Sequence, residues 1–225
     1  MYKNTLFLLS LFSLLITPIH AKGLPEITAL FSSNIMHKDD NNKHYSQWYI
    51  WRTHNKIEIS HKQRPYGEIW HKSSHGNVSF EWIRHDKKFK IIYPESDLAS
   101  LEIQTKWQGK ATMINKKLLS YLSLVGTGTV MGQKTERYKG KIGQYSLEIE
   151  WMPAISLPAY IKEQSEDSLQ VISIKQFYPI GKAPWQRINS DNYDDMDYAD
   201  IGDNEAHPVA RSHIFMGSLT DNQHH

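Results

Sequence analysis

Tyr-Ser-Leu-Glu-Ile-Glu-Trp, residues 145–151, is the stretch that decides the predicted fold. Four large apolar side chains alternate here with Ser146, Glu148 and Glu150. Because successive side chains of a β-strand point to opposite faces, this period of two predicts a strand with one buried face and one wet face. A sheet that is covered on one face only is typically antiparallel.

The same period of two recurs upstream, between residues 43 and 93. It is visible in Lys56–Ser60, Ser79–Trp82 and Lys88–Ile91. Polar turn signals separate these runs, at residues 53–55, 63–65, 74–77 and 86–87. Short strands joined by polar turns predict an antiparallel meander. A further, more apolar strand is predicted over Leu169–Phe177.

Two segments show helical periodicity instead. Leu24–Met36 has apolar residues at positions 27, 30, 31 and 35, which predicts an amphipathic helix. Met113–Val125 places four apolar residues on one stripe, which predicts a second helix: Leu118, Leu119, Leu122 and Val125. The order helix, strands, helices, strands and tail predicts an α+β domain, with one large antiparallel sheet and helices on a single face.

The composition is that of an ordinary globular protein. The chain has 225 residues, of which 40% are hydrophobic and 22% charged, and this length favours one domain. The net charge of +2 is too small to indicate a nucleic-acid partner. The sequence contains no cysteine, which excludes a disulfide scaffold, a thiolate metal site, a cysteine nucleophile and a lipid-modified cysteine.

Residues 1–21 have the pattern of a secretory signal peptide. Lys3 gives a positive start, Leu6–Ile16 is an eleven-residue apolar run, and the small residue Ala21 precedes the predicted cleavage site. The run is about half the length of a transmembrane helix, which needs roughly 20 apolar residues. We therefore expect a periplasmic protein without a lipid anchor and with no transmembrane segment after cleavage.

The region after the signal is predicted to divide into a domain over residues 22–190 and an acidic C-terminal tail over residues 191–225. Asp191–Glu205 contains seven acidic residues and no lysine or arginine, whereas the rest of the mature chain has 25 basic and 17 acidic side chains. Such an asymmetry indicates either a segment that folds back over a basic body or a tail that binds a partner. The apolar anchors in this segment favour partial folding back: Tyr193, Met196, Tyr198 and Ile201.

Several chemical motifs are incomplete. The glycine-rich run 126–132 has the spacing GxGxxxG and leads into a predicted strand, so a tight turn is favoured over a phosphate cradle. His61, His71, His75 and His85 lack the paired spacing of metal ligands, and we expect no resident metal or cofactor.

Neither calcium binding nor hydrolysis has a complete motif. A calcium loop that begins at Asp195 fails because Ala199 and Asp200 occupy its fifth and sixth positions, which leaves only a nonstandard calcium site as an alternative. The sequence contains no GxSxG nucleophile motif, and we predict no enzymatic activity.

A family resemblance is found between Val125 and Ile161. Val125-Gly126 leads through Thr129-Val130 to Gly132, and Ile149-Glu150-Trp151 is followed by Leu157-Pro158-Ala159-Tyr160-Ile161. This pattern resembles the end of the sheet in the periplasmic lipoprotein-carrier, or LolA-like, superfamily. The resemblance implies an incomplete β-barrel whose concave face is lined with aromatic and aliphatic side chains and covered by helices. It also implies an arginine in an early strand, for which Arg52 and Arg84 are the candidates.

Aromatic and aliphatic side chains of the predicted strands would share one face if those strands were neighbours. For any one of them, packing in a core against the helices is the favoured interpretation. As a set they predict a cavity for a lipid, an acyl chain, an acylated protein or another apolar ligand, in a carrier or sensor role. The alternative is an interaction or adaptor protein that binds a partner through Asp191–Glu205. The predicted ligand-binding residues are Phe80, Trp82, Tyr145, Leu147, Ile149 and Trp151.

Overall fold

The computed structural model describes residues 23–38, 43–101, 103 and 107–204. Six strands come first: β1 (Ile27–His37), β2 (Lys43–Arg52), β3 (Lys56–His61), β4 (Tyr66–Lys72), β5 (Val78–Arg84) and β6 (Phe89–Tyr93). Three short helices follow: α1 (Glu95–Ser100), α2 (Trp107–Thr112) and α3 (Lys116–Leu119). The remaining elements are β7 (Ser123–Val130), β8 (Gln133–Ile142), β9 (Tyr145–Met152), β10 (Leu157–Gln164), β11 (Ser168–Pro179), β12 (Asp194–Asp197) and the 3₁₀ turns Tyr198–Asp200 and Gly202–Asn204.

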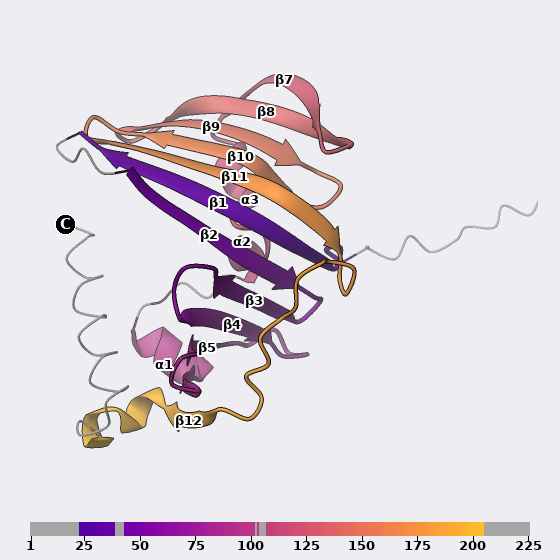
Figure 1. The fold of residues 1–225 in the computed structure, drawn as a ribbon. Helices are drawn as coiled ribbons and strands as arrows, with labels where there is room; N and C mark the ends of the chain where they lie inside the picture. The colour runs from indigo at the N-terminus through magenta and orange to yellow at the C-terminus, as the bar shows by residue number, and fades with distance from the viewer. Residues whose placement is uncertain (1–22, 39–42, 102, 104–106, 205–225) are drawn as a thin grey trace, which may run out of the picture.

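All twelve strands belong to one open sheet with the order β12-β6-β5-β4-β3-β2-β1-β11-β10-β9-β8-β7 (Figure 1). Two meanders, β1–β6 and β7–β11, meet where β1 pairs antiparallel with β11. The neighbouring strands are antiparallel except β12, which runs parallel to β6. The predicted α+β class with one large antiparallel sheet is therefore confirmed.

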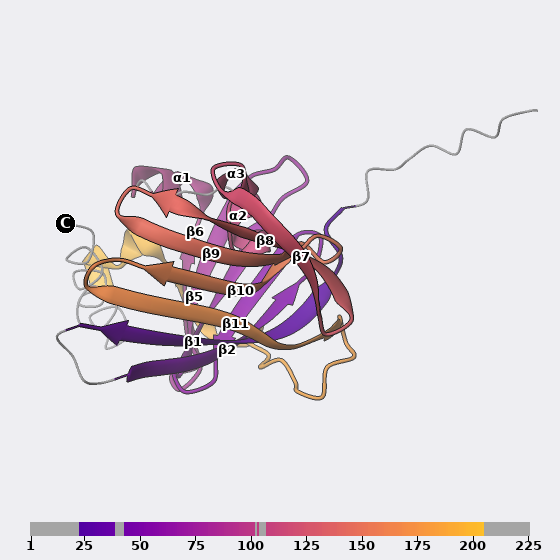
Figure 2. The same cartoon turned by 90° about the horizontal axis from the view of Figure 1, so that it is seen from above.

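The sheet bends around the three helices, which lie on one side of it (Figure 2). We call this side the inner face; on β1 it carries Ala29 and Phe31. Leu98 of α1 and Ala111 of α2 belong to the same core cluster as these two residues and Trp82 of β5. Because burial of apolar surface drives this packing, the helices close the open side of the curved sheet.

The helix predicted over Leu24–Met36 is wrong, since these residues form β1. Ile27–Ser33 is buried at every position. A strand in the middle of a sheet that is covered on both faces loses its alternation of apolar and polar residues, and its apolar spacing then imitates a helix.

The helix predicted over Met113–Val125 is also wrong for most of its length. Only Lys116–Leu119 is helical, and β7 begins at Ser123. The predicted tight turn lies at the end of the glycine-rich run, at Met131-Gly132, where φ is 48° and 76°. Two consecutive residues with positive φ suit the two-residue hairpin that joins β7 to β8.

The segment between β11 and β12 crosses the opposite face of the sheet, which we call the outer face (Figure 1). Residues 180–193, hereafter the strap, lead to β12, and Ser190 within it is buried. Below it, the outer-face side chains of Ile69 and Ile83 are 3% and 1% exposed. The acidic segment therefore begins on the sheet and continues as its edge strand.

The predicted signal peptide and the last part of the predicted tail, residues 205–225, lie outside the described residues. Within the residues that the structure describes, none of the helices has the length and apolar character to cross a membrane.

Candidate functional site

A pocket of about 350 Å³ opens on the inner face, between the ends of β8–β11 and the connection from α2 to α3. A row of side chains aligned across three strands, Ile149, Ile161 and Ile172, forms its floor. Its size is within the range of small-molecule sites. The other lining residues are Met113, Ile114, Leu118, Ile142, Tyr145, Leu147 and the polar pair Glu163 and Gln170.

Three of the six predicted ligand-binding residues line this pocket: Tyr145, Leu147 and Ile149, all on β9. Tyr145 is 38% exposed at its mouth, whereas Leu147 and Ile149 are buried. Trp151 lies on the same strand and is 3% exposed, with the Lys116 ammonium 5.9 Å from its ring centroid. The pocket thus has a solvent-exposed rim at Tyr145 and an apolar interior.

The other two predicted residues, Phe80 and Trp82, lie far along the sheet on β5. Six strands separate β5 from β9, so the neighbouring arrangement considered in the sequence is not found. Phe80 stacks on Trp70 with ring centroids 4.4 Å apart and contacts Tyr93 at 5.2 Å. Both residues pack in the main core cluster, outside the inner pocket.

The pocket residues that sequence reasoning missed belong to two kinds of segment. The sequence predicts a helix for Met113 and Ile114, but they form the irregular link from α2 to α3. Ile172 lies on the predicted strand Leu169–Phe177, and Ile161 ends the stretch Leu157–Ile161 of the family resemblance; the sequence assigns neither of them a facing partner. The register of β9, β10 and β11 is what brings them together, and it could not be read from any one strand.

Arg52 at the end of β2 connects the sheet to the helical cover. Its guanidinium donates hydrogen bonds to the carbonyl oxygens of Ala111 at 2.8 Å, Ile155 at 2.6 Å and Ser156 at 3.2 Å. Two further bonds reach Pro25 O, at 2.9 and 3.1 Å. The residue is 1% exposed, and this burial lowers the pKa of Arg52 to about 10, so the side chain stays charged near neutral pH.

Arg84, the other candidate from the family resemblance, has a different environment. It forms a bidentate pair with Asp86 across the β5–β6 turn, with both N–O distances 2.8 Å. Its hydrogen bonds therefore stay within one turn. Of the two arginines, Arg52 is the one whose hydrogen bonds join β2 to α2 and to the β9–β10 connection.

Within the described ranges, the structure contains no cluster of three or more histidine, aspartate or glutamate side chains arranged to hold a metal ion. The histidines singled out in the sequence serve local contacts. His71 Nε2 lies 2.9 Å from Glu81 Oε1, and the ring of His61 packs against that of Tyr66 with centroids 4.9 Å apart. Burial lowers the pKa of His61.

The acidic segment is anchored by its apolar residues. The ring of Tyr198 stacks on Tyr93 with centroids 4.6 Å apart, and Ile201 is 4% exposed. The Tyr193 hydroxyl lies 3.3 Å from His85 Nδ1, and Asp195 Oδ2 lies 3.9 Å from Lys90 Nζ. This part of the chain is therefore a docked element of the sheet edge.

Comparison with known proteins places this fold beside several solved structures. PNGF-II shares 11% identity over 79% of this chain, with a TM-score of 0.41, and this chain spans 33% of its length. MucB in complex with MucA(peri) shares 16% identity over 73% of this chain and 55% of MucB, with a TM-score of 0.36. A LolA superfamily protein from Nitrosomonas europaea shares 7% identity over 72% of this chain and 88% of its own, with a TM-score of 0.36.

A LolA superfamily protein is thus among the solved structures that this chain resembles. The chain covers only about a third of PNGF-II and just over half of MucB. No family model and no curated protein matches the sequence. These similarities concern the fold, and the function rests on the residues of this chain.

Proposed function

We propose that this protein binds an acyl chain or a similar apolar ligand in the inner pocket, as a non-enzymatic carrier or sensor in the periplasm. The observation that carries the proposal is the lining of the pocket: nine of its eleven residues are aliphatic or aromatic side chains or methionine. Each methylene group moved from water into such a lining contributes about 0.8 kcal/mol. An engineered cavity of about 150 Å³ already binds benzene, and this pocket is more than twice that size.

The polar residues of the pocket suit a ligand with a polar head. Glu163 and Gln170 face each other across β10 and β11, at the same end of the pocket as Tyr145. The apolar row Ile149, Ile161 and Ile172 lies on the other side of them. A chain inserted along this row would keep its head group near the amide and carboxylate, which fixes its direction.

The hydrogen bonds of Arg52 hold the segment next to one wall of the pocket. Ala111, whose carbonyl accepts one of these hydrogen bonds, lies two residues before the pocket residue Met113. Displacement of α2 from the sheet would therefore widen the pocket at that wall.

The test is displacement of a fluorescent fatty acid from delipidated mature protein. Ile172→Trp fills the floor of the pocket and is expected to weaken binding at least about tenfold. Val171→Trp is the matched control, because it places the same bulk on the outer face of the same strand. The proposal fails if the wild-type protein does not bind the probe, or if the two variants lose binding equally while their circular dichroism is unchanged.

The exposed carboxylates of β12 favour a second candidate function, binding of a basic protein partner. Asp194, Asp195 and Asp197 are all exposed, and they lie on the edge strand of the sheet. A partner that co-purifies in equal amount with the wild-type chain and is lost from the Asp194→Asn/Asp197→Asn variant would support this adaptor role. Retention of that partner by the double variant would count against it.

A further inference from the structure

A second pocket, of about 550 Å³, lies on the outer face between the sheet and the strap. The sheet contributes Thr28 of β1, Trp51 of β2 and Glu58 of β3, and the strap contributes Trp185 and Arg187. Its chemistry differs from that of the inner pocket, since ionised and hydrogen-bonding groups lie beside the indole rings. The remaining lining residues are Thr53, Lys56, Ile180, Gly181, Ala183 and Gln186.

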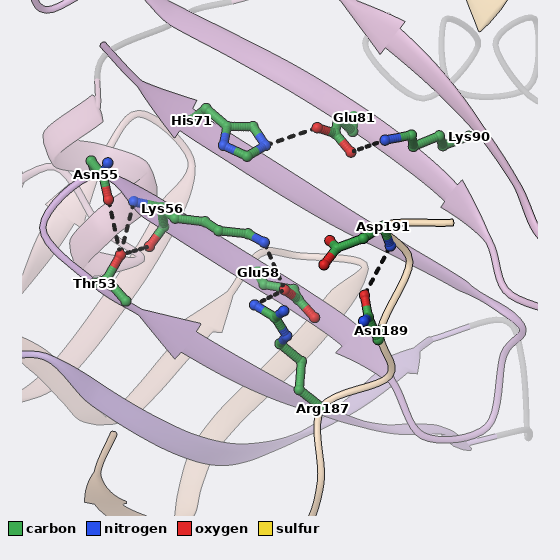
Figure 3. Close-up of polar contacts among 10 residues, drawn as sticks. All are labelled: Thr53, Asn55, Lys56, Glu58, His71, Glu81, Lys90, Arg187, Asn189 and Asp191. Atoms are coloured by element: carbon green, nitrogen blue, oxygen red, sulfur yellow. Dashed lines mark hydrogen bonds and ion pairs between the residues drawn. The ribbon is translucent and has the colours of Figure 1, made fainter. Parts of the chain in front are cut away.

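A buried, paired carboxylate lies at the base of this outer pocket. Glu58 is 5% exposed, and its Oε2 atom lies 3.4 Å from Lys56 Nζ and 3.3 Å from Arg187 Nη1 (Figure 3). Burial raises the pKa of Glu58, and the two cations oppose that rise. Asp191 of the strap lies beside this group and adds a second negative charge (Figure 3). Two cations therefore face two carboxylates, and the formal charges of the site balance.

Two buried hydrogen-bonding atoms of the lining residues have no partner among the described residues. They are Thr28 Oγ1, on a residue that is 0% exposed, and Trp185 Nε1. Buried polar groups are rarely left unpaired in proteins, because each such group costs about 1–3 kcal/mol. One hydroxyl, which can donate and accept, and one indole N–H, which can only donate, are thus unpaired on residues that line the pocket.

Aromatic side chains hold the wall of the outer pocket in place. The ring of Trp185 packs against Tyr49 with centroids 5.0 Å apart and against Tyr178 at 5.4 Å. Trp51 contacts Tyr49 from the adjacent position on the same face, at 5.7 Å. The strap is therefore fixed to the sheet through Trp185, and the indole is positioned before any ligand binds.

We propose that the outer pocket binds a neutral sugar residue. A pyranose ring has an apolar C–H face that can pack on an indole, and its hydroxyl groups both donate and accept hydrogen bonds. An anion would have to compete with Glu58 and Asp191 for the two cations. A cation would have to compete with Lys56 and Arg187 for the carboxylates. A neutral ligand with many hydroxyl groups avoids both penalties and satisfies Thr28 and Trp185.

The experiment measures binding of glucose and N-acetylglucosamine, with glucuronate and glucosamine as charged counterparts, by saturation-transfer NMR on the mature protein. Thr28→Val keeps the shape of the side chain and removes its unpaired hydroxyl. We expect it to weaken sugar binding about two- to tenfold without lowering the melting temperature. Trp185→Phe keeps a ring and removes the N–H, and the same loss is expected. Trp107→Phe on α2 is the matched control and leaves binding unchanged.

Three results would overturn this proposal. One is the absence of binding of either neutral sugar at about 50 mM, far above a millimolar dissociation constant. The second is binding that Thr28→Val and Trp185→Phe leave unaffected. The third is tighter binding of the charged counterparts than of the neutral sugars. Ile172→Trp, which fills the inner pocket, is expected to leave sugar binding intact, so the two sites can be tested separately.

Discussion

Replacing Arg52 by methionine tests how the helical cover is held against the sheet. The substitution keeps an apolar stem of similar length and removes five hydrogen bonds to four backbone carbonyl oxygens. Those oxygens would lose a charged donor in a region that excludes water. Each buried carbonyl oxygen left without its donor costs about 1–3 kcal/mol, and removal of a buried charge offsets part of the sum, so we expect a net loss of about 4 kcal/mol. Since domains are stable by only about 5–15 kcal/mol, this loss is a large fraction of the total.

Urea unfolding followed by tryptophan fluorescence measures this loss. With a slope of about 2 kcal/mol per molar urea, a loss of about 4 kcal/mol lowers the midpoint by about 2 M. Arg84→Met is the matched control, because it removes a pair with Asp86 at the surface, worth about 0–1 kcal/mol, and a cation–π contact 5.9 Å from the Trp82 ring centroid, worth about 0.5–1 kcal/mol. Arg52→Lys is expected to fall between the two, since an ammonium cannot reach all four carbonyls at once. Equal midpoints for Arg52→Met and Arg84→Met would refute the reasoning.

Three further predictions follow from single residues. Gly67→Ala would place a Cβ 2.7 Å from the backbone oxygen of Ile59 on β3, so it is expected to lower the free energy of unfolding by about 1–3 kcal/mol. Gly109→Ala in α2 is the control, because its Cβ would meet open space and is expected to leave stability unchanged or raise it. Thermal melts of the two variants measure the difference. The hydrogen bond from His71 lowers the pKa of Glu81, so the ionised carboxylate stabilises the folded state. Glu81→Gln should therefore lower the free energy of unfolding in urea by about 1 kcal/mol at pH 7. The stability difference between wild type and variant should shrink as the pH falls below about 4.5, where the carboxylate becomes protonated. Tyr198→Ala removes a core stacking contact of the acidic segment and should make that segment cleavable by protease earlier than the rest of the chain.

Much of the sheet could be predicted because strands such as β9 have one buried apolar face and one polar face. The alternation in 145–151 survives in the structure, with Leu147, Ile149 and Trp151 buried and Glu148 and Glu150 half-buried. The turn at residues 74–77 was also predictable, since Gly76 adopts a φ of 92°, which favours glycine. In both cases the controlling interaction is local in sequence.

The sites were harder to predict because they depend on pairing over long separations. Three of six proposed residues line the inner pocket, and the three share one strand, so their common face follows from the period of two alone. Phe80 and Trp82 have the same period, but the strand order places six strands between their strand and β9. The sequence of an isolated strand does not determine which other strands will be its neighbours in the sheet.

The misassigned first strand explains why the outer pocket could not be found from the sequence. Thr28 faces the strap and Ala29 faces the helices, and both are buried because two layers cover β1. A strand with two covered faces has no polar face, so it loses the alternation that would have identified it. The strap covers the outer side of β1, although it lies about 150 residues later in the sequence. Its Trp185 lies in a polar stretch that has neither strand nor helix periodicity. The missing alternation of Ile27–Ser33 and the isolated tryptophan of the strap are thus two consequences of one contact, and that contact builds the wall of the outer pocket.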